Sequence, residues 1–111
     1  MSNLDRLKLL EQFAAEEPKD PFNWYALALE IQEIQPEKAL IYFQKLLSDF
    51  PDYLPTYYPA AHFFAALDKL NEAKVTFEKG ISLSQKLSEI KTLRELQNAY
   101  QNFLFENDID F

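Results

Sequence analysis

The chain has 111 residues, a net charge of −7 and no cysteine, and 48% of its residues are hydrophobic. This length suits one domain, and the apolar content favours a packed core over disorder. The absence of cysteine excludes disulfides and thiolate metal sites, and an acidic balance without clustered Lys and Arg argues against nucleic-acid binding. The single glycine, Gly80, disfavours turn-rich β proteins and phosphate-cradling loops, so we expect no cofactor.

The first residues, MSNLDRLKLLEQF, lack the basic start and long apolar run of a signal peptide. No apolar run approaches the roughly 20 residues needed to span a bilayer. We therefore expect a cytoplasmic protein without a membrane partner.

Apolar residues recur at helical spacing between the prolines, and the period-two alternation of strands is absent. The turns between these segments are very short, so neighbouring helices must be antiparallel. The pattern predicts an all-α fold with helices over residues 3–16, 22–34, 37–49, 56–69, 71–86 and 89–105. The tail over residues 107–111 has no helical signal and is expected to fray.

Residue types predict how these helices begin. Pro36 stands where a first helical residue would lie, and Asn71 and Ser88 are candidate N-caps. The apolar stripes extend to residues near the helix ends, namely Leu4, Ile34, Leu67 and Ile90.

The chain also aligns with itself at an offset of 33 to 34 residues. The aligned pairs are Pro18–Pro51, Trp24–Tyr57, Leu27–Ala60, Ala28–Ala61 and Ile31–Phe64, then Ala39–Ala73, Phe43–Phe77 and Leu47–Ile81. The one-residue slip falls in the turn between paired helices, where a change of length is tolerated. The sequence thus predicts two helix hairpins, preceded by a partial hairpin and followed by one helix.

This period and these residue types resemble the tetratricopeptide repeat. In that family a large aromatic opens the first helix, small residues let the helices approach, an alanine and an aromatic mark the second helix, and a proline closes the repeat. Those places hold Trp24, Leu27, Ala28, Ile31, Ala39, Phe43 and Pro51, and in the second copy Tyr57, Ala60, Ala61, Phe64, Ala73, Phe77 and Gly80.

The resemblance implies a short right-handed superhelix of antiparallel hairpins in a single domain over residues 1–106, with repeats at 18–50 and 51–85 and flanking helices at 3–16 and 89–105 as caps. The second copy departs from the pattern in two ways. Gln85 replaces a closing proline, so the fifth helix is expected to run longer. Pro59 lies inside the fourth helix, where it kinks the helix unless the helix starts near Thr56.

In tetratricopeptide arrays, the first helices of successive hairpins line a concave groove that takes extended peptides or partner helices. The resemblance places Phe22, Tyr25, Leu29, Gln32, Tyr58 and His62 in that groove. We expect an apolar, aromatic surface with little charge. The alternative is that the last helix or the partial first hairpin covers the groove and makes Phe22 and Leu29 part of the core. One sub-type of the family grips a peptide carboxylate with Lys and Asn, which these positions do not offer.

A second candidate surface comprises Ile41 and Val75, which are offset by 34 residues and lie off the main apolar stripe. Apolar residues there could form a homodimer patch, or they could be ordinary exposed side chains. The tail residues Ile109 and Phe111 offer a further alternative, an acidic-apolar peptide that docks into a groove.

His62 is the only histidine. A metal site needs several ligands, and no nucleophile motif accompanies this residue, so we expect neither a metal site nor catalysis. The sequence therefore predicts a non-catalytic interaction module that binds a protein or peptide partner. The alternative is a self-associating structural subunit of a larger assembly.

Overall fold

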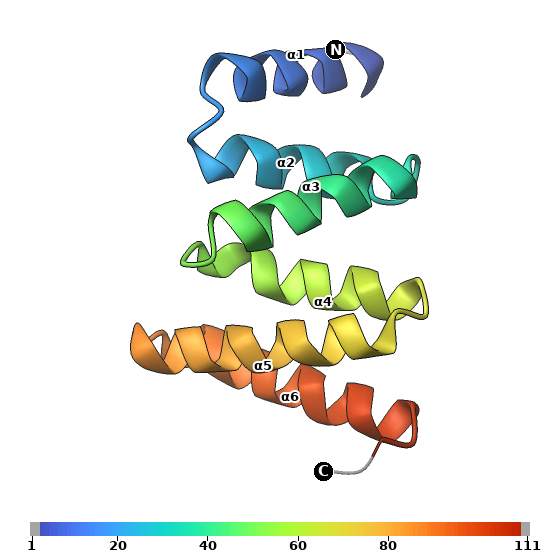
Figure 1. The fold of residues 1–111 in the computed structure, drawn as a ribbon, viewed down its shortest axis with the longest axis vertical. Coiled ribbons are helices and arrows are strands. Elements are labelled where there is room, and N and C mark those ends of the chain that lie inside the picture. The colour runs from blue at the N-terminus through green and yellow to red at the C-terminus, as the bar shows by residue number, and fades with distance from the viewer. Residues whose placement is uncertain (1–2, 110–111) are drawn as a thin grey trace. The chain divides into compact units, whose positions relative to one another are not determined.

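The computed structural model describes residues 3–109, and this range forms six α-helices and one 3₁₀ turn without a strand (Figure 1). The predicted all-α fold is confirmed. The chain divides into two compact units, Met1–Thr56 and Tyr57–Phe111. The single domain over residues 1–106 stays a prediction.

The first unit contains α1 (Asn3–Glu16), α2 (Pro21–Ile31), α3 (Pro36–Asp49) and the 3₁₀ turn η1 (Leu54–Thr56). Helix α2 packs against both α1 and α3. The buried apolar side chains come mainly from α2 and α3, and are Ala14, Leu27, Ala28, Ile31, Ala39, Phe43 and Leu46. These include five aligned repeat positions of the first hairpin, Leu27, Ala28, Ile31, Ala39 and Phe43, whereas Trp24 and Leu47 are half-buried. The predicted core of this hairpin is confirmed at those five positions.

The second unit contains α4 (Tyr57–Ala66), α5 (Leu70–Lys86) and α6 (Ile90–Glu106). Helix α5 packs against both α4 and α6. Its buried apolar side chains are Tyr57, Ala60, Ala61, Phe63, Phe64, Ala73, Phe77, Leu83, Leu96, Ala99, Phe103 and Leu104. Six aligned positions of the second hairpin are among them, namely Tyr57, Ala60, Ala61, Phe64, Ala73 and Phe77, and Gly80 is buried beside them, whereas Ile81 is half-buried.

Prolines mark the helix starts as expected in two places. Pro36 is the first residue of α3. Helix α4 begins at Tyr57, so Pro59 lies in its first turn, where no helical hydrogen bond is lost and no kink is required. The start of α2 was missed by one residue, because Pro21 is its first residue and the Asp20 carboxylate caps it by accepting from the Phe22 N–H at 3.0 Å.

The two predicted N-caps are wrong. Helix α5 begins at Leu70, so Asn71 lies inside it. Ser88 lies between α5 and α6, with a φ of 56°. Three helices end with a residue in this left-handed region, Asp68 after α4, Ser88 after α5 and Asp108 after α6.

These three ends share one hydrogen-bond pattern. The N–H of the next residue donates to a carbonyl five residues earlier, as in Lys69 to Phe64 at 2.9 Å, Glu89 to Ser84 at 2.9 Å and Ile109 to Leu104 at 2.8 Å. This is the Schellman motif, which usually has glycine at the left-handed position. Here Asp and Ser take that conformation, which is why a chain with a single glycine makes such tight turns.

The predicted apolar stripes were too long at their ends. Helix α2 ends at Ile31, three residues earlier than expected, and Ile34 is 72% exposed in the turn that follows. Leu67 lies in the turn after α4, and Leu4 and Ile90 are exposed near the starts of α1 and α6. Helix α5 has 17 residues against 14 in α3, as expected from Gln85.

Gly80 is the point where the three helices of the second unit come closest. A Cβ atom at this position would lie 2.7 Å from the Tyr57 Cβ of α4 and 3.1 Å from the Leu96 Cδ1 of α6. Contacts below 3 Å between carbon atoms require something to move. A glycine in the middle of α5 is therefore explained by close packing on two sides.

We expect Gly80→Ala to lower the free energy of unfolding by about 1–3 kcal/mol, because the added methyl group overpacks this contact. In an ordinary exposed helical position the same change would raise stability by about 1 kcal/mol. Chemical denaturation followed by circular dichroism measures the difference. Ser82→Ala, at an exposed position in the same helix, is the matched control. A Gly80→Ala protein as stable as wild type would contradict the close-packing account.

Candidate functional site

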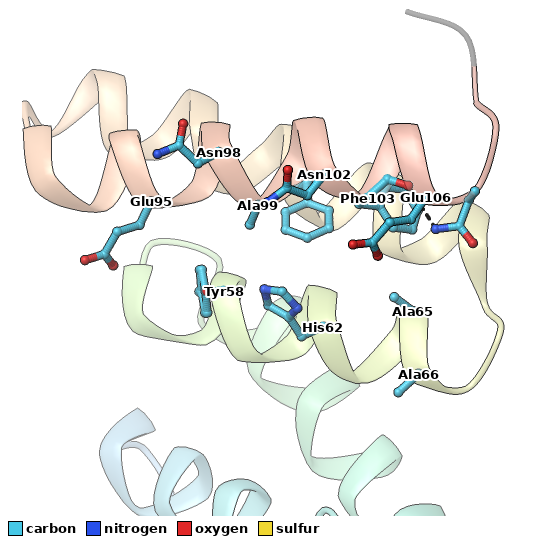
Figure 2. A pocket seen from close by; sticks show the side chains of 12 residues that line it. Tyr58, His62, Ala65, Ala66, Glu95, Asn98, Ala99, Asn102, Phe103 and Glu106 are labelled. Atoms are coloured by element: carbon cyan, nitrogen blue, oxygen red, sulfur yellow. Dashed lines mark hydrogen bonds between the residues drawn. The ribbon is translucent and has the colours of Figure 1, made fainter.

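An open hollow of about 690 Å³ lies between α4 and α6 in the second unit (Figure 2). Helix α4 contributes one wall, α6 the facing wall, and Phe77 of α5 lies behind them. The lining residues are Tyr58, His62, Ala65, Ala66, Phe77, Glu95, Asn98, Ala99, Asn102, Phe103, Glu106 and Asn107.

The wall from α4 presents two aromatic rings. Tyr58 and His62 lie one helical turn apart, with their ring centroids 4.5 Å from each other. Tyr58 is 42% exposed and His62 is also exposed. Behind them, the Phe77 ring lies 5.6 Å from His62 and 5.4 Å from Phe103, in tilted and edge arrangements that aromatic pairs favour.

The wall from α6 is polar. Glu95, Asn98, Asn102 and Glu106 follow one another at spacings of three, four and four residues, which places them on one face of the helix. The expectation of an aromatic surface with little charge is therefore wrong for this wall. The spacing was visible in the sequence, but this helix was interpreted from its apolar stripe alone, as a cap. Helix α6 lines the hollow without burying Tyr58 or His62.

The hollow shifts the titration of its histidine. Partial burial lowers the pKa of His62 below its ordinary value of 6.5, while the nearby Glu106 carboxylate acts in the opposite direction with a smaller effect. The imidazole is therefore neutral at pH 7, and the negative charge of the hollow comes from Glu95 and Glu106.

A hydrogen bond between side chains joins α6 to α5 beside this site. The Tyr100 hydroxyl donates to the Glu78 carboxylate at 2.9 Å, and burial together with this bond raises the pKa of Tyr100 to about 12. The Tyr100 ring also packs 5.6 Å from Phe77. The facing wall is thus fixed by side chains that do not themselves line the hollow.

The other four predicted groove residues belong to the first unit. Phe22 is exposed on α2, Tyr25 and Leu29 are half-buried on the same helix, and Gln32 is half-buried in the turn after it. The Tyr25 ring packs edge-on against Tyr53 at 5.8 Å. Burial raises the pKa of Tyr25, so its hydroxyl is a neutral donor and acceptor at physiological pH. Phe22 is thus not part of the core of this unit.

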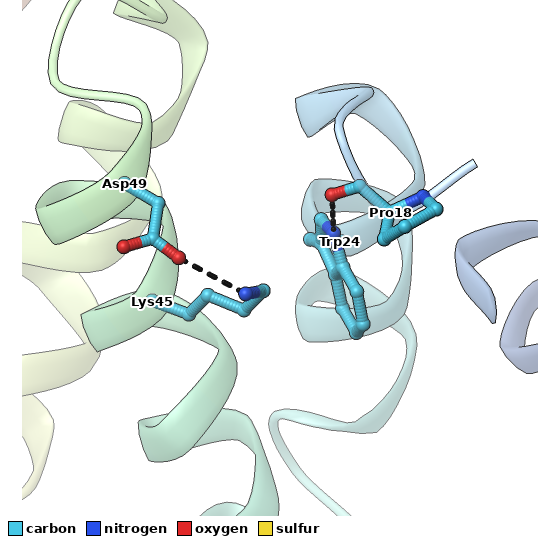
Figure 3. A network of polar contacts seen from close by, with 4 residues as sticks. All are labelled: Pro18, Trp24, Lys45 and Asp49. Carbon is cyan, nitrogen blue, oxygen red and sulfur yellow. Dashed lines mark hydrogen bonds and ion pairs between the residues drawn. The ribbon is translucent and has the colours of Figure 1, made fainter.

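Trp24, by contrast, connects neighbouring segments of the first unit. Its indole Nε1 donates to the Pro18 carbonyl at 2.8 Å, and its ring lies under the Lys45 ammonium at 5.0 Å (Figure 3). Lys45 in turn contacts Asp49 at 3.0 Å. The aromatic residue that opens the first repeat therefore joins α2 to the preceding loop and to α3.

The remaining predicted residues are placed as follows. Ile41 on α3 is 61% exposed and Val75 on α5 is 47% exposed. Ile109 follows the end of α6, and Phe111 lies outside the described residues, so the interpretation of this tail as a docking peptide stays a hypothesis. Within residues 3–109, no group of three or more potential ligands could hold a metal ion, and no helix is long and apolar enough to cross a membrane.

The helix hairpins of each unit, joined by short turns and packed through small residues, define a helical-repeat protein. Comparison with solved structures gives a tetratricopeptide repeat domain protein from Salinibacter ruber, in its solution NMR structure, with 36% sequence identity and a TM-score of 0.72 over 78% of this chain and 88% of that one. The crystal structure of the tetratricopeptide repeat domain protein from the same organism gives 35% identity and a TM-score of 0.71 over 76% and 96%.

The chain belongs to the tetratricopeptide repeat family. Domains of this family generally act as protein-interaction modules, and their scaffold is generally non-catalytic. No family model matches the sequence, and no curated protein matches it.

The titration of His62 tests the geometry of the hollow. Proton NMR should give a pKa below 6.5 for the single imidazole, since burial disfavours its charged form. Glu106→Gln should lower that pKa further, because it removes the negative charge that favours the imidazolium, while Glu95 and Tyr58 remain. Glu33→Gln, an exposed change in the first unit, serves as the control and should leave the pKa unchanged. A His62 pKa at or above 6.5 would contradict this description.

Proposed function

We propose that the chain is a non-catalytic interaction module that binds a segment of a partner protein in the hollow between α4 and α6. The observation that carries this proposal is an open hollow with two adjacent aromatic rings, Tyr58 and His62, left accessible by the packing around them. Aromatic side chains in concave sites supply large contact area with few rotatable bonds, and such residues dominate binding energy at interfaces.

The rings of α4 contribute to the binding energy that a working interaction needs. Burying a large aromatic side chain is worth about 1.5–3 kcal/mol, and a micromolar complex needs about 8 kcal/mol after the cost of association. The two rings of α4 supply part of that energy. The amides of Asn98 and Asn102 on the facing wall add hydrogen-bonding groups for the backbone of a bound segment.

The face of α2 is proposed as a second contact for the same partner. Phe22, Tyr25 and Leu29 keep apolar surface accessible, and Gln32 adds an amide at the end of the helix. Tyr25, Leu29 and Gln32 lie 33 residues before Tyr58, His62 and Ala65 of the α4 wall, so these three occupy the corresponding repeat positions. Two contacts on one chain raise overall affinity when a single partner reaches both.

We propose a non-catalytic role because the scaffold of this family is generally non-catalytic. The titratable side chains that line the hollow are Tyr58, His62, Glu95 and Glu106. We propose a cytoplasmic setting, as the sequence indicated, with a protein as the partner.

The direct test replaces one ring in each contact. Tyr25→Ala with Tyr58→Ala should remove the proteins that wild type captures from a native lysate, measured by quantitative mass spectrometry, while circular dichroism shows unchanged helicity. Phe105→Ala is the matched control, because Phe105 is 83% exposed on α6 and does not line the hollow. Partners retained by a folded double variant would show that these faces are not the binding site.

A second candidate function is self-association as a structural subunit. It is favoured by the exposure of two aliphatic side chains, Ile41 and Val75, on helices that otherwise present polar residues to solvent. Exposed apolar patches often mark contacts between copies of a chain.

Light scattering over a range of concentrations tests this alternative. If these residues mediate association, wild type gains mass with concentration, and Ile41→Glu with Val75→Glu gives a monomer because charges are costly to bury. A wild-type chain that stays monomeric at all concentrations would exclude the dimer. A double variant that still dimerises would exclude these two positions.

A further inference from the structure

We propose that the segment bound between α4 and α6 is basic, with two Lys or Arg residues about five positions apart on either side of an apolar stretch. This inference rests on the proposed function, since it names the chemistry of the partner for the same hollow. It follows from the positions of two carboxylates, the lack of compensating charge, and the rings between them.

The two carboxylates lie at opposite ends of one helical face. Glu95 and Glu106 are eleven residues apart, which is close to three full turns of α6. At about 1.5 Å of rise per residue, their Cα atoms are separated by roughly 16 Å along the axis. An extended chain advances about 3.3 Å per residue, so this separation corresponds to about five residues of a bound strand. Figure 2 shows the two side chains at the two ends of the site, with Tyr58 and His62 in the space between.

Nothing in the lining neutralises these carboxylates. No Lys or Arg lines the hollow, and neither Glu95 nor Glu106 forms an ion pair in the described part of the chain. His62 is neutral at pH 7, because burial lowers its pKa. The whole chain carries a net charge of −7, which adds a field of the same sign. Acidic partners are repelled from this site, and basic ones are attracted.

Glu106 also occupies a position that is electrostatically unfavourable for a carboxylate. It is the last residue of α6, and a negative charge at a helix C-terminus opposes the helix dipole. The negative charge of Glu106 favours the charged form of His62 and so acts to raise the pKa of this residue. The carboxylate therefore contributes to the electrostatic field inside the hollow. A charge that works against the stability of its own helix, while facing an open site, is explained by a role in binding.

The middle of the site suits an apolar stretch. Tyr58 and His62 form one side, and Ala99 and Phe103 the other, with Phe77 behind. The ring face of Tyr58, which lines the same hollow as the two glutamates, is favourable for a cation at close range. The carboxylates, rather than the aromatic rings alone, therefore determine which segments bind.

The test is selection of a random peptide library, displayed on phage, against the purified full chain. Peptides recovered by wild type should be enriched in Lys and Arg pairs about five positions apart. Glu95→Gln with Glu106→Gln should lose that enrichment and weaken binding of the recovered peptides by at least tenfold in fluorescence titrations. Glu33→Gln with Glu37→Gln removes the same charge from exposed positions of the first unit and is the control, which should bind as wild type does.

Thermal unfolding separates binding from folding. Because Glu106 opposes the dipole of α6, the Glu95→Gln, Glu106→Gln variant should melt at the wild-type temperature or above it. A weaker binder that is equally stable supports the proposal.

The outcomes distinguish this inference from the function on which it rests. Peptides that need Tyr58 but carry no basic pair would overturn the basic-segment proposal and leave the interaction module standing. Basic peptides bound equally by the control and the Glu95→Gln, Glu106→Gln variant would also overturn it. Recovery of no peptide that depends on Tyr58 or His62 would overturn both.

Discussion

The close approach of three helices at Gly80 is the constraint on which the second unit depends. A Cβ atom at this position would lie 2.7 Å from the Tyr57 Cβ of α4 and 3.1 Å from the Leu96 Cδ1 of α6, so only glycine fits without movement. Both neighbours are thereby held against one helix, and the space left between α4 and α6 becomes the hollow. Tyr100 and Glu78 then fix the other side of α6 against α5. The site is a product of packing at positions that do not line it.

Tight turns make this packing possible in a chain with one glycine. Asp68, Ser88 and Asp108 adopt the left-handed conformation that closes the three helices of the unit. At each end, the N–H of the following residue donates a hydrogen bond to the carbonyl five residues before it. Ala60 and Ala61 of α4 are buried in the core, while the Tyr58 and His62 rings lie on the accessible face of the helix. Polar residues on α6 complete a site that is aromatic on one wall and acidic on the other.

Much of the fold could be predicted from the sequence, because the repeat offset and the apolar period are both properties of the chain itself. The buried positions Phe43, Phe64 and Phe77 follow from them directly. The helix ends could not be predicted, since Asp and Ser take the left-handed conformation without any pattern that separates them from N-caps. The polar wall of the site was missed for a different reason. Glu95, Asn98, Asn102 and Glu106 had the right spacing, but their facing partner, α4, is known only from the three-dimensional arrangement.

The central claim is that the hollow between α4 and α6 is where a partner segment lies. Two-dimensional NMR of the isotope-labelled chain tests this location residue by residue. Spectra are compared without peptide and with a saturating concentration of a peptide recovered in the phage selection. The account predicts that the largest shifts fall on the backbone amides of Tyr58, His62 and Phe103 and on the side-chain amides of Asn98 and Asn102. Shifts concentrated instead around Ile41 or Val75, with these signals unchanged, would contradict it.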